Sequence, residues 1–284
     1  VRDAARPPVA RAVDLLVVGA GPAGLEAARV ASLAGHSVRV VERADRSGGM
    51  LRTAAEGAGR RRLAVLCDWL ESECVRLGAR LELGAAARAC DVEEHLLAGG
   101  RVVLASGSVP GELRYRAEPG ARVLVVEDVM RMLAQGGLEG LAGRPVVVDD
   151  PSGGPVGVHT AELLASAGAI VSLVTGDAVA AVMLASTGDL GPANRRLAAA
   201  GVRVRARQVL RVVGARRVVI QDRWSRLEET LEAAAVVDAG YRLPAPALVS
   251  DRPGVTRVGD AVAPRTVYEA VLEGRRAALA LGQA

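Results

Sequence analysis

The sequence contains no phenylalanine and no lysine, and aromatic residues make up only 2% of its 284 positions. Valine, leucine and alanine must therefore build the hydrophobic core. Because all 36 basic residues are arginine, a Schiff-base lysine and the lysine of a phosphate-binding P-loop are excluded. No aromatic residues stand between the arginines as a base-stacking surface would need, so the sequence predicts no nucleic-acid binding. The net charge of +4 favours anionic nucleotides or an acidic partner surface.

Cysteine is scarce as well, with Cys67, Cys74 and Cys90 and no C-x-x-C pair. This excludes a zinc ribbon and a vicinal redox disulfide. The spacing puts Cys67 and Cys74 near one face of a helix, so we expect buried, reduced thiols of an intracellular protein. No apolar run reaches membrane-spanning length, and no signal-peptide pattern precedes the first strand. We therefore expect a cytoplasmic protein without membrane binding and without a metal site.

The most informative segment is a glycine motif that follows a strand. Residues 13–18 are apolar enough for a buried parallel strand, and G-x-G-x-x-G follows at once with Gly19, Gly21 and Gly24. In this motif the first glycine allows a tight turn and the second lets a pyrophosphate approach the backbone. The third permits close packing of the helix against the strand. The helix predicted over 22–34 then offers free N–H groups and positive potential to phosphates.

A second strand strengthens this interpretation. Residues 37–42 end in Glu42, whose carboxylate can accept hydrogen bonds from a ribose diol. Strand, glycine turn, helix and terminal acid together predict a dinucleotide site. The alternative is a glycine-rich turn in some other α/β protein.

A second strand–turn–helix unit begins at Pro145. Here 146–150 predicts a strand, 151–157 a glycine-rich turn, 160–167 a helix and 169–175 the next strand. The second unit therefore repeats the arrangement of the first about 130 residues later in the chain.

The remaining periodicity completes the expected architecture. Further helices are predicted over 62–77, 188–200 and 265–282, and a short strand over 80–83. Alternating segments at 202–206, 209–213 and 217–221 are typical of a small antiparallel meander. We therefore predict an α/β protein with two Rossmann-like, three-layer dinucleotide-binding domains, the second inserted in the first. The first domain would span 1–112 and 243–284, and the second would span 113–242.

Four motifs in order resemble the flavin-disulfide-reductase-like superfamily, whose members have two dinucleotide-binding domains. They are the first glycine motif with Glu42-Arg43, Gly48-Gly49-Met50, Ala105-Ser106-Gly107-Ser108-x-Pro110, and Gly259-Asp260-Ala261. A closer resemblance is to the C-terminal half of 2,4-dienoyl-CoA reductase and trimethylamine dehydrogenase, carried by residues 147–150, 222–225 and 259–265. In those proteins a barrel like that of old yellow enzyme, with FMN and an iron–sulfur cluster, precedes such a module.

The resemblance implies FAD in the first domain. The implied cofactor residues are Gly19, Gly21, Pro22, Ala23 and Gly24 at the pyrophosphate, Glu42 at the adenosine ribose, Arg43 and Ala87 near the adenine, Gly49 and Met50 at the ribityl-phosphate side, Asp260 at a ribityl hydroxyl, and Thr266 and Val267 at the flavin ring, with Arg52, Ala105 and Gly107 also at the site. Flavin chemistry needs no protein base, so no catalytic side chain is expected.

The second glycine motif departs from the family pattern. Asp149 and Asp150 stand where glycines are usual, and two carboxylates there repel a pyrophosphate unless they point away. Gly154 and Gly157 keep the later part of the motif, and the next strand ends in Thr175, with neither an acid nor an arginine beside it. Two alternatives stay open. NAD(P)H binds at Gly154, Gly157 and Thr175, or the domain is vestigial and kept for packing or docking.

Three functions are compatible with these features. The first is an FAD-containing subunit that passes electrons between NAD(P)H and a barrel partner with FMN and an iron–sulfur cluster, as in a split ene-reductase or dehydrogenase. The second is a structural subunit of an amine-type dehydrogenase that binds ADP or FAD and has a vestigial NAD(P) site. The third is a free-standing NAD(P)H–flavin reductase.

Side chains outside these motifs are expected to have ordinary structural places. His36 and His95 should lie at the surface. His159 should lie on the exposed side of a helix, and the alternative is a phosphate contact near the second glycine turn. Tyr241 and Tyr268 should pack in the core.

Overall fold

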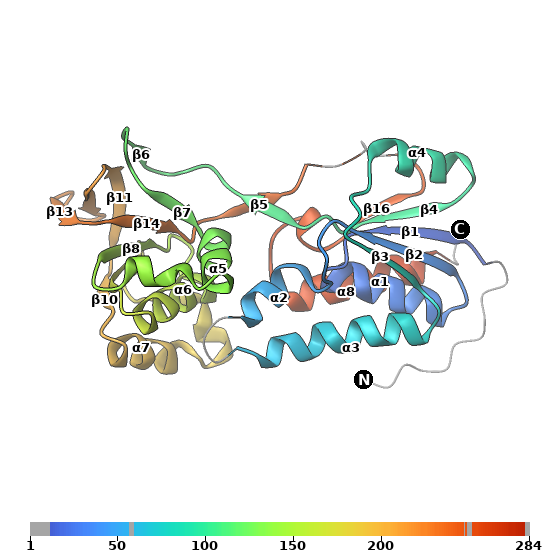
Figure 1. Ribbon diagram of the computed structural model, residues 1–284, viewed down its shortest axis with the longest axis horizontal. Helices are drawn as coiled ribbons and strands as arrows, with labels where there is room; N and C mark the ends of the chain where they lie inside the picture. The colour runs from blue at the N-terminus through green and yellow to red at the C-terminus, as the bar shows by residue number, and fades with distance from the viewer. Residues whose placement is uncertain (1–11, 57–59, 247, 249–251, 282–284) are drawn as a thin grey trace. The chain divides into compact units, whose positions relative to one another are not determined.

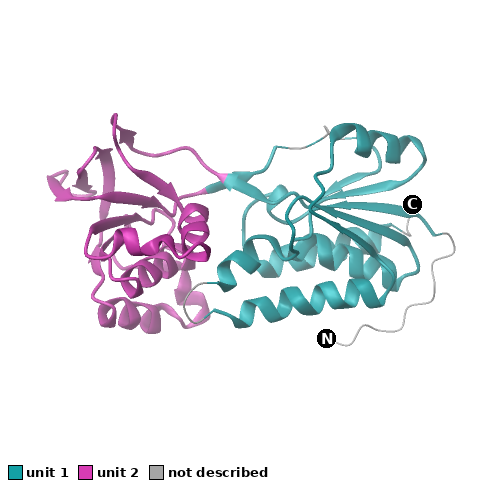
Figure 2. Ribbon diagram, in the orientation of Figure 1, with its two compact units in different colours: residues 1–109, 242–284 teal, residues 110–241 magenta. Residues whose placement is uncertain are grey.

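The computed structural model describes residues 12–56, 60–246, 248 and 252–281. The chain divides into two compact units, shown in Figure 2. Unit 1 comprises residues 1–109 and 242–284, and unit 2 comprises residues 110–241. Unit 2 is thus inserted in unit 1. Both units contain a parallel sheet with helices against it, so the predicted α/β fold is confirmed.

Unit 1 is built on a five-stranded parallel sheet with the strand order β16-β4-β1-β2-β3. Its strands are β1 (Asp14–Val18), β2 (Ser37–Glu42), β3 (Arg80–Leu83), β4 (Arg101–Leu104) and β16 (Val255–Arg257). Successive strands run outward from β1 to β3, and the chain then returns to place β4 on the other side of β1. The strand order therefore reverses at β1, where open α/β sheets bind ligands outside the carboxyl ends of their strands.

Helices cover both faces of this sheet (Figure 1). They are α1 (Pro22–Leu33), α2 (Gly49–Ala55), α3 (Arg62–Arg76), α4 (Ala89–Leu97) and α8 (Val267–Ala280). Leu15 and Val17 point to the face packed by α1, α3 and α8, and Leu16 and Val18 point to the face covered by α4. This alternation follows from the period of two in a strand. Glu26 of α1 pairs there with Arg29 and Arg275, which joins α1 to α8 through a buried charge.

Unit 2 has its own five-stranded parallel sheet, in the order β10-β9-β8-β14-β7. Its strands are β7 (Val123–Val125), β8 (Pro145–Asp149), β9 (Ile170–Val174), β10 (Arg203–Arg205) and β14 (Ala235–Asp238). One face packs against α5 (Val126–Ala134), α6 (Pro155–Ser166) and α7 (Leu190–Ala199), and short 3-10 turns lie at Gly137–Leu141 and Val182–Thr187.

A second sheet covers the opposite face of the unit 2 sheet. It has the order β13-β12-β11-β6, from β6 (Arg116–Ala117), β11 (Gln208–Val213), β12 (Arg217–Asp222) and β13 (Glu228–Glu232). The predicted meander was therefore wrong in one strand. Residues 203–205 pair in parallel with β9, and the third antiparallel strand is β13. The residues of β13 are mostly acidic and exposed, so the sequence shows no alternation of apolar and polar residues from which a strand could be predicted.

The last strand pair lies where the chain leaves unit 1 and returns to it. It consists of β5 (Ser108–Pro110) and β15 (Arg242–Pro244). A short 3-10 turn, Gly259–Ala261, then leads toward α8. The helices at 49–55, 89–97 and 126–134 were not predicted. They are shorter than the window of about 11 residues in which a helical pattern is normally recognised, although the apolar residues of 126–134 do follow a helical spacing.

Five side chains lie elsewhere than predicted. His36 and His159 are buried at 6% and 5% exposure, and the His95 side chain is only 9% exposed. His36 Nδ1 accepts a hydrogen bond from the Val13 N–H, which explains how the core holds it. Tyr241 and Tyr268 are instead 52% and 68% exposed.

Candidate functional site

The candidate site of unit 1 lies at the carboxyl edge of its sheet. Strands β1, β2, β4 and β16 are parallel neighbours, so the segments after Val18, Glu42, Leu104 and Arg257 begin at one edge. The turn of the first glycine motif, the Ala105 to Gly107 segment and Asp260 are therefore gathered by the sheet topology. The sequence places these motifs far apart in the chain.

The three glycines of the first motif have three different surroundings. Gly19 adopts φ +103°, and a Cβ there would lie 2.3 Å from the Ala105 carbonyl oxygen. A Cβ at Gly24 would lie 1.9 Å from the Gly19 carbonyl oxygen. A Cβ at Gly21 would have no heavy atom within 4 Å. Only the second glycine therefore faces open space, as a backbone that receives a phosphate must.

Helix α1 begins directly behind this open backbone. Gly21 is its N-cap residue and Pro22 its first residue, where a proline loses no hydrogen bond. Ala23 is buried against α8, since a Cβ at Gly274 would lie 2.1 Å from its carbonyl oxygen. The helix end carries no side-chain cap, so its positive potential is directed at whatever lies beside Gly21.

The start of α2 lies against the same turn. The Gly48 N–H donates to the Ala20 carbonyl oxygen at 2.7 Å, and a Cβ at Gly49 would lie 3.3 Å from the Gly21 Cα. Met50 follows and is 38% exposed. Arg52 turns back into unit 1, where its Nη2 donates to Asp68 Oδ1 at 2.8 Å. The Gly48 to Met50 loop is thus a second helix start beside the first.

Glu42 is held by the backbone on both of its oxygens. Oε2 accepts from the Ala20 N–H at 2.8 Å and Oε1 accepts from the Ala44 N–H at 2.9 Å. A carboxylate oxygen has a second lone pair, so the group can still receive a ribose hydroxyl. Arg43 follows on the surface, and Ala87 packs beside α4 on the Leu16 face of the sheet.

Asp260 is positioned by two residues that the sequence did not single out. The Ser108 hydroxyl donates to Asp260 Oδ2 at 2.9 Å, and Arg242 Nε donates to Ser108 Oγ at 2.9 Å. Arg242 Nη2 also donates to the Ser108 carbonyl oxygen. Ser108 could have been found from the sequence, because it lies in the Ala105-to-Pro110 motif. Arg242 could not, because only the pairing of β5 with β15 brings it to Ser108.

Helix α8 begins near this carboxylate with a complete N-terminal cap. The Thr266 hydroxyl accepts from the Tyr268 N–H, and Glu269 accepts from the Thr266 N–H. Val267 is the first residue of the helix and is 38% exposed. The Arg265 N–H points at Asp260 Oδ1, 3.4 Å away. The helix end and Asp260 therefore stand at one place on the sheet edge.

The glycine turn of unit 2 is closed by a side chain. Asp150 is fully buried, and its Oδ1 accepts from the Ser152 hydroxyl and the Gly153 N–H, both at 3.0 Å. Gly154 is the N-cap of α6, and a Cβ at Gly157 would lie 2.4 Å from the Asp150 Cγ. Burial raises the pKa of Asp150 to about 6, against the Ser152 hydroxyl and the N–H groups of the turn, which lower it.

A second buried carboxyl lies at the end of the same strand. Asp149 is 6% exposed and pairs in register with Asp238 of the neighbouring strand β14. Burial, then repulsion by Asp238 and Asp150, raises its pKa to about 7, and Arg114 opposes this shift.

The surroundings of Thr175, at the end of β9, differ from those that the sequence predicted. Thr175 is 1% exposed, and its hydroxyl oxygen faces the Asp177 N–H at 3.4 Å. Arg223 donates from Nη1 to the Gly176 carbonyl oxygen at 2.8 Å. No arginine stands beside Thr175 in the sequence, yet the turn after β12 brings one there. Sequence spacing gave no signal for this contact.

Two of the three cysteines, Cys67 and Cys74, are unsuited to redox exchange. Cys67 and Cys74 are fully buried and free, which confirms the prediction of buried thiols, and Cys90 is exposed. Burial raises the pKa of Cys67, and it raises the pKa of Cys74 to about 12. A thiol that stays protonated is a poor nucleophile, so these two residues do not replace the missing C-x-x-C.

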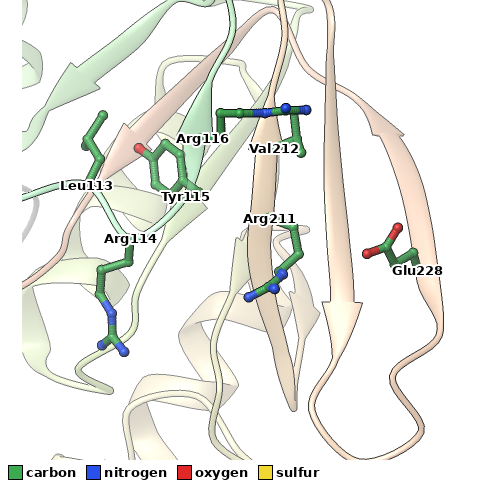
Figure 3. A pocket seen from close by; sticks show the side chains of 7 residues that line it. All are labelled: Leu113, Arg114, Tyr115, Arg116, Arg211, Val212 and Glu228. Atoms are coloured by element: carbon green, nitrogen blue, oxygen red, sulfur yellow. The ribbon is translucent and has the colours of Figure 1, made fainter.

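A pocket of about 630 Å³ opens on unit 2 (Figure 3). It is lined by Leu113, Arg114, Tyr115, Arg116, Arg211, Val212 and Glu228. Three arginines and one glutamate line it, and Arg116 is itself paired with Glu118. None of these residues belongs to either glycine turn.

Within residues 12–56, 60–246 and 252–281, no helix is both long enough and apolar enough to cross a membrane. In the same part of the chain, no three histidine, cysteine or acidic side chains gather so that they could hold a metal ion.

The fold and the open glycine turn are those of a two-unit nucleotide-binding oxidoreductase. Residues 13–258 match the model of the pyridine nucleotide-disulphide oxidoreductase family, and the chain belongs to this family. Family membership indicates a fold that binds FAD and NAD(P)H.

Two related proteins and one solved structure show what kinds of enzyme this chain is similar to. The chain is 31% identical over 315 residues to the multifunctional alkene reductase/demethylase OYE of Caballeronia cordobensis, covering 97% of this chain and 44% of that protein. It is 35% identical over 165 residues to the metal reductase of Desulforamulus reducens, covering 57% of this chain and 24% of that protein. The structure of histamine dehydrogenase from Rhizobium sp. 4-9 superposes with a TM-score of 0.85 at 27% identity, covering 97% of this chain and 45% of that chain.

These matches confirm the resemblance to flavoproteins that carry a barrel like that of old yellow enzyme. They also confirm that the chain is related to flavin-dependent reductases and dehydrogenases. The chain spans less than half the length of each of these three proteins.

Proposed function

We propose that this chain is the FAD-binding module of an old-yellow-enzyme-type oxidoreductase, and that it exchanges electrons with a barrel partner carrying FMN and an iron–sulfur cluster. The observation that carries the proposal is the open backbone at Gly21, set between two packed glycines at the start of α1. Because nothing else lies within 4 Å of a Cβ at that position, the turn has room for a diphosphate.

The residues present fit FAD in unit 1. Gly19, Gly21, Pro22, Ala23 and Gly24 would hold its pyrophosphate through the N-terminus of α1. Glu42 would accept from the adenosine ribose through its remaining lone pairs, and the Gly49 and Met50 backbone lies beside the same turn. When bound, FAD supplies the transfer of hydride or of single electrons.

At the other end of the site, Asp260 and α8 would orient the flavin part of the cofactor. Ser108 donates to the Asp260 carboxylate and is itself held by Arg242, so the orientation of the carboxylate is fixed. The N-terminus of α8 at Thr266 and Val267 favours negative charge beside it. Since the sequence has no C-x-x-C pair, electrons on the FAD need an acceptor other than a vicinal disulfide of this chain, which supports a barrel partner. The barrel would belong either to the same longer protein or to a separate subunit.

The role of NAD(P)H separates two candidate functions. In the first, NAD(P)H binds at Gly154, Gly157 and Thr175 of unit 2 and reduces the FAD, as family membership favours. In the second, unit 2 is a packing or docking domain and electrons do not come from NAD(P)H. The buried Asp149 and Asp150 at the glycine turn favour the second candidate.

One experiment tests FAD binding and separates the two candidate functions. We expect the purified chain to show a flavin absorbance spectrum and to release FAD on denaturation. NADH and NADPH are then added without oxygen. Bleaching of the flavin by either coenzyme would support the first candidate, and an unchanged spectrum that dithionite still bleaches would support the second. A chain that takes up no FAD even on reconstitution would contradict the proposal.

A further inference from the structure

The glycine turn of unit 2 has the architecture of an anion site. Strand β8 ends at Asp149, the turn follows, and the 12-residue helix α6 begins at Pro155 with Gly154 as its N-cap. The turn N–H groups and the helix N-terminus together create positive potential at this point. In unit 1 the equivalent point, beside Gly21, is open.

In unit 2 the Asp150 carboxylate occupies this point. Its Oδ1 receives the Ser152 hydroxyl and the Gly153 N–H at 3.0 Å each. The side chain is fully buried, and Oδ2 has no hydrogen-bond partner. A buried carboxylate oxygen without a partner is costly, and the two hydrogen bonds on Oδ1 offset part of that cost.

The glycines around the turn are fitted to this side chain. A Cβ at Gly157 would lie within 2.6 Å of three atoms of Asp150, the Cγ, the Cβ and Oδ2. The third glycine of the motif therefore makes room for a carboxylate here, whereas Gly24 in unit 1 makes room for the Gly19 backbone. A Cβ at Gly153 would lie 2.6 Å from Asp177 Oδ2, which places a second carboxylate at the turn.

We propose that Asp150 is a built-in substitute for the diphosphate of a nucleotide, and that it closes the second nucleotide site of this chain. The carboxylate accepts from the Gly153 N–H and the Ser152 hydroxyl, which would otherwise be free to bind a diphosphate. Asp177 places a second carboxylate beside the turn, and its negative charge opposes entry of a phosphate. Unit 2 thereby keeps its fold without a nucleotide. The inference deepens the second candidate function above and rests on unit 2 alone.

The test replaces the internal anion with an external one. The variant Asp150→Gly removes the carboxylate, and inorganic pyrophosphate is the probe. The thermal midpoint of the full chain should fall by about 5 °C in the variant, because charged hydrogen bonds are lost. Saturating pyrophosphate should then raise the variant midpoint by about 3 °C more than it raises the wild-type midpoint.

Two comparisons make the result specific. Asp150→Asn retains an oxygen acceptor in the turn and should show no greater pyrophosphate response than wild type. Asp150→Ser is the second emptied variant, for use where Asp150→Gly does not fold. Pyrophosphate binding to unit 1 is common to all variants and cancels in the comparison.

Two outcomes would overturn the proposal. An equal pyrophosphate response in wild type and in the emptied variants would show that Asp150 does not close the turn. No response beyond wild type in either emptied variant would show that the turn is not an anion site. FAD content is measured on the same preparations and should not change, so failure here is distinguishable from failure of the proposed function.

Discussion

Replacing Gly24 with alanine is expected to destabilise unit 1 by about 3 kcal/mol or more. The new Cβ would lie 1.9 Å from the Gly19 carbonyl oxygen, and that atom belongs to a backbone with no freedom to rotate away. Gly19 is itself held at φ +103° against Ala105, so neither partner can give way alone. Helix α1 would have to move off β1, which would open the core around Leu15 and Leu25.

The matched variant Gly21→Ala should behave in the opposite way. The new Cβ meets nothing within 4 Å, and φ of −74° suits alanine. We expect stability to change by about 1 kcal/mol or less, the usual difference at an N-cap. FAD retention should nevertheless be lost, because the methyl group stands where the diphosphate approaches the backbone.

Urea unfolding and the FAD released per chain measure the two effects on the same proteins. A Gly24→Ala protein as stable as wild type would contradict the packing argument. A Gly21→Ala protein that keeps its FAD would show that the cofactor diphosphate does not lie at this turn. The pair therefore separates a packing glycine from a binding glycine within one motif.

Replacing Asp149 with asparagine is expected to stabilise the protein at pH 8 by about 4 kcal/mol, and to change little at pH 4. Burial and the charges of Asp238 and Asp150 raise the pKa of Asp149 to about 7 in the folded chain. In the unfolded chain the carboxyl has the pKa of a free aspartate, about 3.9. Asparagine has the shape of the protonated acid and stays neutral at every pH.

The sign of this effect follows from the raised pKa. The folded state binds the proton more tightly than the unfolded state, so the neutral carboxyl's contribution is fully present below about pH 4. It is lost as the pH rises through 7. Wild-type stability should therefore decline across this range, and the decline should be shallower in Asp149→Asn.

Urea unfolding at a series of pH values from 4 to 8 provides the measurement. Asp45→Asn, which removes an exposed carboxylate of unit 1, is the control for the loss of one charge. Parallel stability curves for wild type and Asp149→Asn would show that Asp149 is not held neutral by its surroundings. A stabilisation of equal size in the control would indicate a general charge effect.

Much of this architecture could be predicted because it rests on local patterns. The run 13–18, the spacing of Gly19, Gly21 and Gly24, and the acid at Glu42 are dictated by neighbours in the chain, so the sequence alone predicts a strand, a tight turn and a helix. The residue types and motifs that the sequence lacks were equally informative about function. A chain without C-x-x-C has no vicinal disulfide, whatever its fold.

Other features depend on residues that are distant in the chain. Arg242 reaches Ser108 and Asp260 only through the β5–β15 pairing, and Arg223 reaches Gly176 only through the turn after β12. The strand β13 was missed because its acidic residues resemble a loop, and its hydrogen bonds come from β12. Pairing between distant segments leaves no local period to detect.

The sequence by itself determined the two glycine turns, the inert cysteines and the class of fold, because these follow from residue type and spacing. Only the tertiary structure decided what fills each turn. In unit 1 the elements packed around the turn leave the backbone at Gly21 open. In unit 2 the space beside Gly157 is filled by the Asp150 side chain. The direction of a side chain within a turn depends on the atoms packed around it, and spacing along the chain does not record them.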